Sequence, residues 1–271
     1  MKKVLLATVL LAGSALASPT LAADLPRKAA PIVVPPPVFS WSGLYGGINA
    51  GYGFDSDRDV QTTGQAAINV TNVAGGARPA SVRQEREGGI FGGQFGYNWQ
   101  IMPNWLIGIE ADFSGGDIDD TNNVVTIPLN GIGTLNNTFN SRLDYLGTVR
   151  GRFGYTFDRT LVYATGGFAY GGVTNTVSFF GPAGQLQFVG SNRDTETGYA
   201  VGGGIEHYLT NNFSVKAEYL YYDLGRTTVN VAVIPGSGGG GTGYNSRFEN
   251  EGHIVRFGLN YKFTGPLFGA F

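Results

Sequence analysis

Closely spaced carboxylates are the side chains of this sequence best suited to hold a cation. They form two groups in polar segments: Asp55, Asp57 and Asp59, and Asp117, Asp119 and Asp120. Alternate carboxylates are typical ligands of hard divalent cations. An EF-hand is excluded, because Val60 and Ala66 stand where that motif needs a glycine and a glutamate. Two interpretations stay open: solvated surface charge, or a cation bridge between these segments and an anionic partner.

Acyl-transfer or lipid-modifying chemistry would need a serine, a histidine and an acid in contact. The sequence has two histidines, His207 and His253, and the second lies near Ser246 and Glu251. A catalytic triad is recognised by geometry, which this spacing does not fix. The glycine clusters are not followed by Lys-Ser/Thr, so they do not form a phosphate-binding loop. We therefore predict a protein that is not an enzyme and that holds no cofactor.

The composition excludes several other classes of site. The 271 residues include no cysteine, which rules out disulfides, thiol catalysis, thiolate metal ligands and a lipidated cysteine. Charged residues make up 14% of the chain, against about 25% in globular domains, whereas there are 44 glycines and 13% aromatic residues. The net charge of −2 gives no basis for binding nucleic acid. Few charges with many glycines and aromatics favour a β architecture that has an apolar outer surface.

The stretch from Gly89 to Phe113 shows the element that organises the chain. Up to Trp99 apolar or aromatic residues alternate with small or polar ones. The pattern stops at Pro103-Asn104 and then resumes, now with Glu110 and Asp112 on the polar face. A period of two residues indicates β-strands, and Pro-Asn supplies the turn of a hairpin. An apolar face rich in aromatics, opposite a face with carboxylates, is typical of a membrane-spanning β-barrel.

The same alternation recurs along the chain and predicts eight strands. We expect them at residues 44–54, 89–100, 105–114, 144–155, 161–171, 198–206, 213–222 and 255–263. The facing of strand 161–171 is ambiguous in the sequence, and we assign the lipid side to Val162, Ala164, Phe168 and Tyr170. The segments between strands are alternately long and short; the long ones are 55–87, 115–141, 172–194 and 225–250. This layout predicts an all-β, antiparallel, up-and-down transmembrane barrel of the OmpA/OmpX type, with long extracellular loops and short periplasmic turns.

Charged residues on the polar face are predicted to fill the interior of this barrel. They are Glu110, Asp112, Asp144, Arg150, Arg152, Glu206, Lys216, Glu218, Arg256 and Lys262. A soluble barrel would turn this face to water, but its narrow interior would then have to take all the aromatics, which are too many and too large. Five acids and five bases in one lumen should pair into an ionic plug, because an unpaired buried charge is costly.

The N-terminal segment predicts export and fixes the orientation. Residues 1–22 have the charged start, apolar segment and small-residue cleavage site of a secretory signal. We expect a proline-rich periplasmic tether at 23–40, the barrel at 41–264 and a C-terminal tail at 265–271. No other run is long and apolar enough for a helical span. Because the tether precedes the first strand, the short turns are predicted to be periplasmic.

Tryptophan gives a separate signal for the same orientation. All three tryptophans, Trp41, Trp99 and Trp105, fall at the end of the predicted barrel that carries the short turns. Tryptophan is enriched at membrane–water interfaces. The three are therefore predicted to form an interfacial aromatic girdle.

Three motifs carry a family resemblance. They are A-A-D-L-P at 22–26, W-S-G-L-Y-G-G-I-N-A-G-Y-G at 41–53 and H-I-V-R-F-G-L-N-Y-K-F at 253–263. In this order and spacing they resemble the small outer-membrane barrels of alphaproteobacteria, the outer membrane immunogenic protein or porin-family group. The resemblance implies a place in the cell outer membrane among lipid and lipopolysaccharide. It also implies that the barrel-assembly machinery reads Phe263, although here eight more residues follow it.

Three functions remain open at this stage. The first is a structural protein that supports envelope integrity and displays four surface loops, as the resemblance implies. The second is a narrow porin-like channel, which is disfavoured because eight strands leave room only for side chains. The third is adhesion or ligand binding by the loops, including contact with a host surface. In any of them, the loop carboxylates are either solvated surface charge or ligands of cations that bridge to lipopolysaccharide, and the first interpretation is favoured.

Overall fold

The computed structural model describes residues 39–55 and 58–264. This part of the chain contains ten strands and one short helix. They are β1 (Gly43–Phe54), β2 (Arg58–Gly64), α1 (Ala67–Ala74), β3 (Ser81–Gln84), β4 (Glu87–Met102), β5 (Trp105–Thr126), β6 (Leu135–Phe157), β7 (Thr160–Phe180), β8 (Leu186–Tyr208), β9 (Phe213–Val233) and β10 (Gly243–Lys262). Among these residues no helix has the length and apolar character needed to cross a bilayer. The predicted signal, most of the tether and the tail lie outside the described residues.

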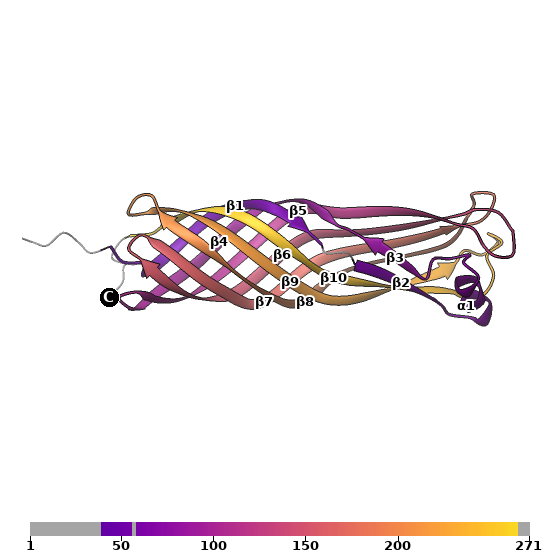
Figure 1. Ribbon diagram of the computed structural model, residues 1–271, viewed down its shortest axis with the longest axis horizontal. Coiled ribbons are helices and arrows are strands. Elements are labelled where there is room, and N and C mark those ends of the chain that lie inside the picture. Colours follow the sequence, from indigo (N-terminus) through magenta and orange to yellow (C-terminus); the bar gives the residue numbers. More distant parts are fainter. Residues whose placement is uncertain (1–38, 56–57, 265–271) are drawn as a thin grey trace, which may run out of the picture. The chain divides into compact units, whose positions relative to one another are not determined.

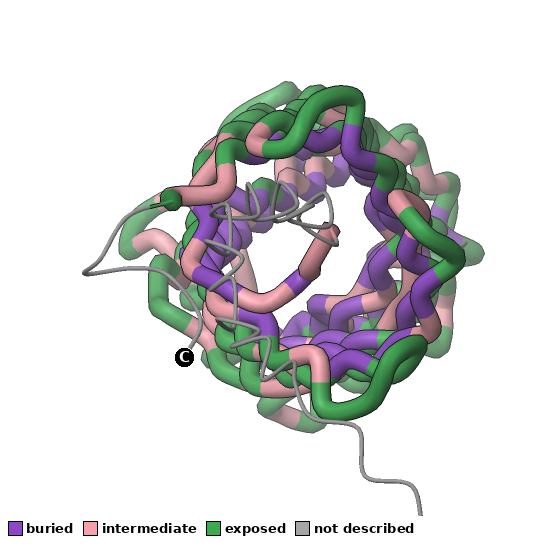
Figure 2. The backbone as a smooth tube through the Cα atoms, turned by 90° about the vertical axis from the view of Figure 1, so that its left-hand side faces the viewer, coloured by how far each residue is buried: buried purple, intermediate pink, exposed green. Residues whose placement is uncertain are grey.

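The strands form one antiparallel sheet that closes on itself (Figure 1). From β1 the order runs through β4 to β10 in sequence, and β10 pairs back with β1, so that Tyr45 lies opposite Lys262. Figure 2 shows the resulting ring of strands end-on. The structure thus confirms an all-β, antiparallel, up-and-down barrel.

The sheet has ten strands where eight were expected. The two additional strands, β2 and β3, lie in the first segment predicted to be a loop, residues 55–87. β2 pairs with β10 next to the point where β1 ends, and β3 pairs with β2 and leads into β4. The pair therefore prolongs the wall that β1 and β4 begin.

Short turns gather at one end of the barrel and longer connections at the other (Figure 1). Pro103-Asn104 joins β4 to β5, and Asp158-Arg159 joins β6 to β7. Asp158 has a φ of 53°, a left-handed conformation that aspartate adopts more readily than most residues. At the opposite end the connections span residues 127–134, 181–185 and 234–242.

Strands β5 to β10 are much longer than predicted. Each has 20 to 23 residues, whereas about 9–11 residues cross a bilayer. We call the half next to the short turns the turn-side section; it comprises residues 43–54, 87–115, 145–171, 199–223 and 253–262. We call the other half the loop-side section; it comprises residues 58–84, 117–143, 173–197 and 224–252. The segments 115–141, 172–194 and 225–250, expected to be loops, are therefore mostly strand.

The residues of β5 show why the sequence pattern did not predict the strands of the loop-side section. Its outward residues are apolar as far as Phe113, but beyond the glycine pair 115–116 they are Asp117, Asp119 and Thr121. Inward, the carboxylates of the first half give way to Ile118. Because the apolar residues now face inward and are diluted by Asn, Thr and Gly, the segment resembles a polar loop.

A second apolar core fills the loop-side section. It consists of Val60, Val82, Phe139, Val177, Phe179, Phe188, Val229, Val231, Tyr244 and Phe248. Tyr244 lies edge-on to Phe179 and Phe188, with ring centroids 5.2 and 5.0 Å apart. Helix α1 adds to the same end, where the Asn69 amide donates to the Gly240 carbonyl at 2.9 Å. This half is thus built like a water-soluble barrel, with apolar side chains inside.

Candidate functional site

An ionic layer crosses the interior of the turn-side section. Its members come from five strands: Glu110 and Asp112 on β5, Arg150 and Arg152 on β6, Glu206 on β8, Lys216 and Glu218 on β9, and Arg256 on β10. All eight side chains are buried. Four carboxylates face four cations, so the layer carries no net formal charge.

The register of the sheet places opposite charges next to each other. Glu110 lies directly across from Arg150, and Glu218 lies across from Arg256. Glu206 is likewise opposite Lys216. Cross-strand pairs of opposite charge stabilise a sheet, and a buried charge requires such a partner. The sequence therefore builds the layer through strand pairing.

Arg150 lies at the centre of the layer. Its Nη2 donates to Glu110 Oε1 at 2.9 Å and to Asp112 Oδ2 at 2.8 Å, and its Nη1 donates to Glu218 Oε1 at 3.1 Å. Arg256 joins two of the same acids, with Nε 2.7 Å from Glu218 Oε2 and Nη1 2.9 Å from Asp112 Oδ1. Three carboxylates thus share two guanidinium groups.

The remaining cations complete the layer on the side of the short turns. Lys216 Nζ donates to Glu110 Oε1 at 2.8 Å, and Arg152 Nη2 donates to Glu206 Oε2 at 2.7 Å. The Tyr45 hydroxyl accepts a hydrogen bond from Arg152 Nη1 at 2.5 Å and donates to Glu110 Oε2 at 2.8 Å. The Tyr45 hydroxyl therefore links Arg152, which is paired with Glu206, to Glu110, which is paired with Lys216.

Several neutral members of this network were not predicted as site residues. Tyr163 donates to Glu218 Oε1 at 3.0 Å. Gln94 donates to Asn260 at 2.7 Å, and Asn260 donates to Glu206 at 2.9 Å. Tyr45, Gln94 and Asn260 occupy the polar face of the period-two pattern, which was the available signal. Tyr163 lies on β7, the strand whose facing was ambiguous.

Two predicted lumen charges lie elsewhere. The pairing of β6 with β7 shifts between Leu143 and Tyr145, and this bulge turns Asp144 away from the interior. Its carboxylate pairs instead with Arg142, 3.0 Å away. Lys262 stays at the end of its strand, where Nζ donates to the Ser40 carbonyl and lies 5.5 Å from the Phe39 ring centroid. The prediction that these two join the charge network is wrong.

The tryptophans divide in a similar way. Trp99 and Trp105 are 47% and 39% exposed on the outer face near the short turns. Trp41 is only 1% exposed, and its indole Nε1 donates to the Asp158 carbonyl at 3.0 Å. The segment 39–42 turns into the end of the ring (Figure 2), so Trp41 closes the barrel instead of facing outward. The prediction of an interfacial position is therefore wrong for Trp41.

Apolar layers enclose the ionic layer on both sides. Toward the short turns lies an end plug of Trp41, Leu106, Leu161, Tyr163 and Tyr208. Toward the other end lies a middle layer of Ile90, Ile118, Leu143, Leu146, Ala169, Val173, Ala200, Leu220, Tyr222, Leu224 and Ile254. The second core of the loop-side section follows. The interior is thus occupied by side chains along its whole described length.

The outer face of the turn-side section is an apolar belt. Exposed large hydrophobic residues lie on every strand around it, among them Ile48, Phe91, Ile109, Val149, Phe168, Val201, Tyr219 and Phe257. So much contiguous exposed apolar surface is unstable in water and matches the lipid-facing band of a membrane barrel.

Comparisons with known proteins identify the family of this chain. The model of the outer membrane protein beta-barrel domain matches residues 8–263. The chain belongs to the outer membrane protein β-barrel family. It is 34% identical to the 31 kDa outer-membrane immunogenic protein of Brucella melitensis, over 97% of this chain and 100% of that protein. It is 31% identical to the 22 kDa outer membrane protein of Rhizobium leguminosarum, over 64% of this chain and 66% of that one. Among solved structures, OprG from Pseudomonas aeruginosa covers 83% of this chain and 97% of its own, with a TM-score of 0.46 and 14% identity.

These matches confirm the resemblance drawn from the sequence and place this family member in the cell outer membrane. The apolar belt is accordingly the surface in contact with lipid. Strand halves of about ten residues beyond the bilayer, at 3.3 Å per residue and a tilt near 40°, carry the loop-side section roughly 25 Å past the membrane.

Three of the aspartates proposed as cation ligands are engaged otherwise in this barrel. Asp55 forms an ion pair with Arg86 at 2.5 Å, and Asp117 forms one with Arg142 at 3.1 Å. Asp120 accepts a hydrogen bond from the Glu85 amide. Across residues 39–55 and 58–264 no group of three or more His, Asp and Glu side chains is placed to hold a metal ion. Asp57 lies outside the described residues.

The residues considered for a catalytic triad are also separated. Ser246 is buried inside the barrel, where its hydroxyl lies 3.1 Å from that of Thr62. His253 is partly exposed on the outer face, with Nδ1 2.7 Å from the Tyr219 hydroxyl. Glu251 accepts a hydrogen bond from Tyr221. Because the serine and the histidine are on opposite faces of β10, they form no triad.

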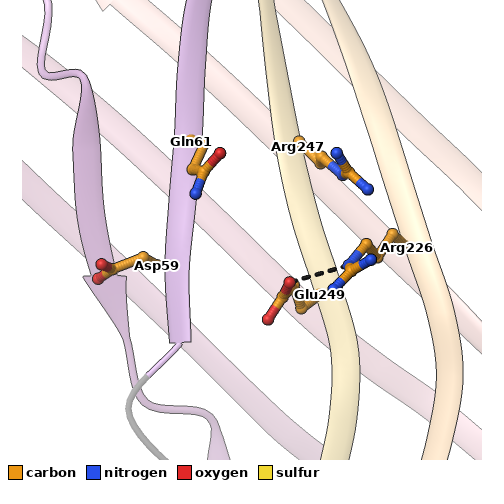
Figure 3. Close-up of a pocket in the computed structure, with 5 residues that line it drawn as sticks. All are labelled: Asp59, Gln61, Arg226, Arg247 and Glu249. Carbon is orange, nitrogen blue, oxygen red and sulfur yellow. Dashed lines mark hydrogen bonds and ion pairs between the residues drawn. The ribbon is translucent and has the colours of Figure 1, made fainter.

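A polar groove lies on the outer face where β2, β9 and β10 meet (Figure 3). It has a volume of about 170 Å³ and is lined by Asp59, Gln61, Arg226, Arg247 and Glu249. Arg226 Nε and Glu249 Oε1 are 2.9 Å apart, but the Arg226 side chain is mostly exposed. Exposed pairs of this kind contribute little energy, and the two signs of charge are balanced. The groove therefore offers no built site for an ion.

Proposed function

We propose that this protein is a closed, non-conducting outer-membrane barrel that holds a rigid structure above the bilayer and supports envelope integrity. The observation that carries the proposal is the filled interior. An aromatic end plug, a neutral ionic layer, a middle apolar layer and a second core follow one another along the barrel. Ions cross a barrel through water, and each of these layers replaces water with packed side chains.

Surface display is the second part of the proposal. It is supported by the length of β5 to β10, whose outer halves and their apolar core form a structure beyond the lipid. It is also supported by the similarity to a Brucella protein described as an outer-membrane immunogenic protein. On this view the barrel anchors the loop-side section, and that section is the part other molecules meet.

Conductance of the refolded protein in a planar bilayer tests the closed lumen. A heat-shift gel first shows that the barrel is folded. We expect no conductance steps, because the ionic layer has no water-filled path through it. Stable, ion-selective steps would instead support the narrow channel, above all if Arg150→Ala or Glu218→Ala changed their size or selectivity.

Whole cells test the envelope role. A strain that lacks the gene should become more sensitive to detergent and should recover when the chain is supplied again. The variant Arg226→Lys is the control: it keeps the charge of an exposed surface residue and leaves the interior unchanged, so it should restore resistance as the natural chain does. Unchanged detergent sensitivity in the deletion strain would contradict the structural role without affecting the closed lumen.

A further inference from the structure

The three connections at the end of the loop-side section and the segment that follows α1 meet around one small cavity. Its volume is about 130 Å³. Arg78 enters it from the segment after α1, Ile132 from the β5–β6 connection, Pro182 from the β7–β8 connection and Gly238 from the β9–β10 connection. Its walls come from segments far apart in the chain, so the loops jointly define it.

Arg78 is the charged group of this cavity, and it is only 3% exposed. Its Nη1 donates to Asn137 Oδ1 and to the Phe180 carbonyl, both at 2.9 Å, and its Nη2 donates to Gln187 Oε1 at 3.0 Å. These acceptors are all neutral. The Tyr244 hydroxyl is a further neutral hydrogen-bond partner of this guanidinium group, which has five N–H donors in all.

Aromatic rings hold the guanidinium group from the core side. The Cζ atom of Arg78 lies 5.1 Å from the ring centroid of Phe179 and 5.6 Å from that of Phe188. Cation–π contacts of this kind stabilise a cation without neutralising it. The positive charge is therefore oriented by its surroundings and remains uncompensated.

The other buried arginines of the described chain all have a carboxylate partner. Arg86 is 2.5 Å from Asp55, and Arg150, Arg152 and Arg256 each have an acid within 2.8 Å. Arg78 forms no ion pair with any described carboxylate. The pKa values reflect this contrast. Burial works to lower the pKa of Arg86, but the Asp55 carboxylate outweighs it and the pKa is raised. For Arg78, burial lowers the pKa.

We propose that this cavity binds a small oxyanion, a phosphate or a small carboxylate, on the guanidinium group of Arg78. A buried cation without an anion is costly, and an anion supplied from outside would remove that cost. Guanidinium groups bind carboxylates and phosphates through paired, charge-assisted hydrogen bonds. The Asn72 and Gln187 amides and the Tyr244 hydroxyl also line the cavity and add neutral polar groups. The volume is well above the roughly 10–15 Å³ that a cavity needs to hold one water molecule, which leaves room for such an anion.

Calorimetric titration of the refolded full chain tests this site. Sodium phosphate and sodium acetate are titrated separately at constant ionic strength, with sodium chloride as the balancing salt and acetamide as the neutral analogue of acetate. We expect saturable binding of at least one anion and none of acetamide. Phosphate binding alone, or acetate binding alone, identifies which oxyanion the site takes.

Variants locate the binding. Arg78→Gln should weaken it roughly tenfold or more, because the charge-assisted hydrogen bonds are lost. Arg226→Gln removes the same charge from the exposed outer face and should leave the affinity unchanged. If Arg78→Gln fails the heat-shift gel, Arg78→Lys replaces it; this variant keeps the charge but loses the planar donors, and should weaken binding roughly threefold or more. Absence of saturable binding to the natural chain, or equal effects of the Arg78 and Arg226 variants, would overturn the proposal.

Discussion

Strands β5 to β10 turn opposite kinds of side chain inward in the two sections of this barrel. In the turn-side section the outward residues are apolar and the interior holds eight paired charges. In the loop-side section most outward residues are polar and the interior holds Phe139, Phe179, Phe188 and Tyr244. Lipid surrounds the first section and water the second. The surrounding solvent, more than the strand itself, thus decides which side chains turn inward.

The difference teaches what holds each section together. Burial of apolar side chains away from water stabilises the loop-side section. In the turn-side section the outward apolar side chains stay in contact with lipid, so their removal from water does not favour a closed ring. Cohesion there comes from the hydrogen-bonded ladders, from the ionic layer, in which unpaired polar groups would be costly, and from the apolar layers packed on either side of it.

Breaking the ionic layer should give the largest effect. Arg150→Ala removes a cation that contacts Glu110, Asp112 and Glu218 and leaves a net charge of −1 in the layer. Loss of one partner of a buried ion pair costs about 3–5 kcal/mol of unfolding free energy. Urea unfolding in lipid vesicles measures it, and the fluorescence of Trp99 and Trp105, at the barrel's outer face, reports the transition.

The matched control is an arginine of the loop-side surface. The Arg142 side chain is 49% exposed and pairs with Asp117 and Asp144. Arg142→Ala should cost about 0–1 kcal/mol, as exposed ion pairs do. If both substitutions cost the same small amount, the ionic layer does not hold the turn-side section together.

One pair of substitutions on β5 sharpens the contrast between the outer faces. Ile109 and Val125 are both exposed, β-branched and outward-facing on this strand, the first in the lipid belt and the second beyond it. Ile109→Arg should cost about 2–4 kcal/mol, the range for arginine near the bilayer midplane. Val125→Arg should change stability by less than about 0.5 kcal/mol, as at an ordinary water-facing site.

The same vesicle unfolding measures both variants. A large loss for Val125→Arg would mean that the lipid belt extends farther along the strands than the two-section description allows. A negligible loss for Ile109→Arg would mean that the face of the turn-side section is not in contact with lipid at that depth.

The turn-side section could be predicted from the sequence because its two faces differ strongly. Between Trp105 and Phe113 the outward residues are apolar, and Glu110 and Asp112 stand on the other face, so the period of two is plain. The eight charges of the ionic layer followed from that period alone. Their pairing followed from the cost of leaving any of them unpaired.

The position of Asp144, the strands of the loop-side section and the surroundings of Arg78 depend on features that a local sequence pattern does not contain. Asp144 was misplaced because one bulge reverses the facing of β6, and nothing in the neighbouring residues announces it. In β7 the inward Val177 and Phe179 alternate with Thr and Ser, so a strand with an apolar inner face resembles a polar loop. Arg78 gives no signal at all, because its partners come from three distant strands or connections.

The smallest expected effect concerns the wall of the loop-side section. There β3 and β5 do not pair as a ladder; side chains bridge them, with Asn122 donating to the Arg83 carbonyl at 2.7 Å. Asn122→Ala should cost about 0.5–1.5 kcal/mol locally, the worth of one hydrogen bond. Amide hydrogen exchange in β3 should then quicken while β7 and β8 stay unchanged, since a local opening exposes only its own segment. Thr138→Ala is the control, because its hydroxyl donates to Asn123 across the complete β5–β6 ladder. Equal exchange in β3 for both variants would mean that the side-chain contacts between β3 and β5 do not hold this part of the loop-side wall, and that the wall there is as continuous as that of the turn-side section.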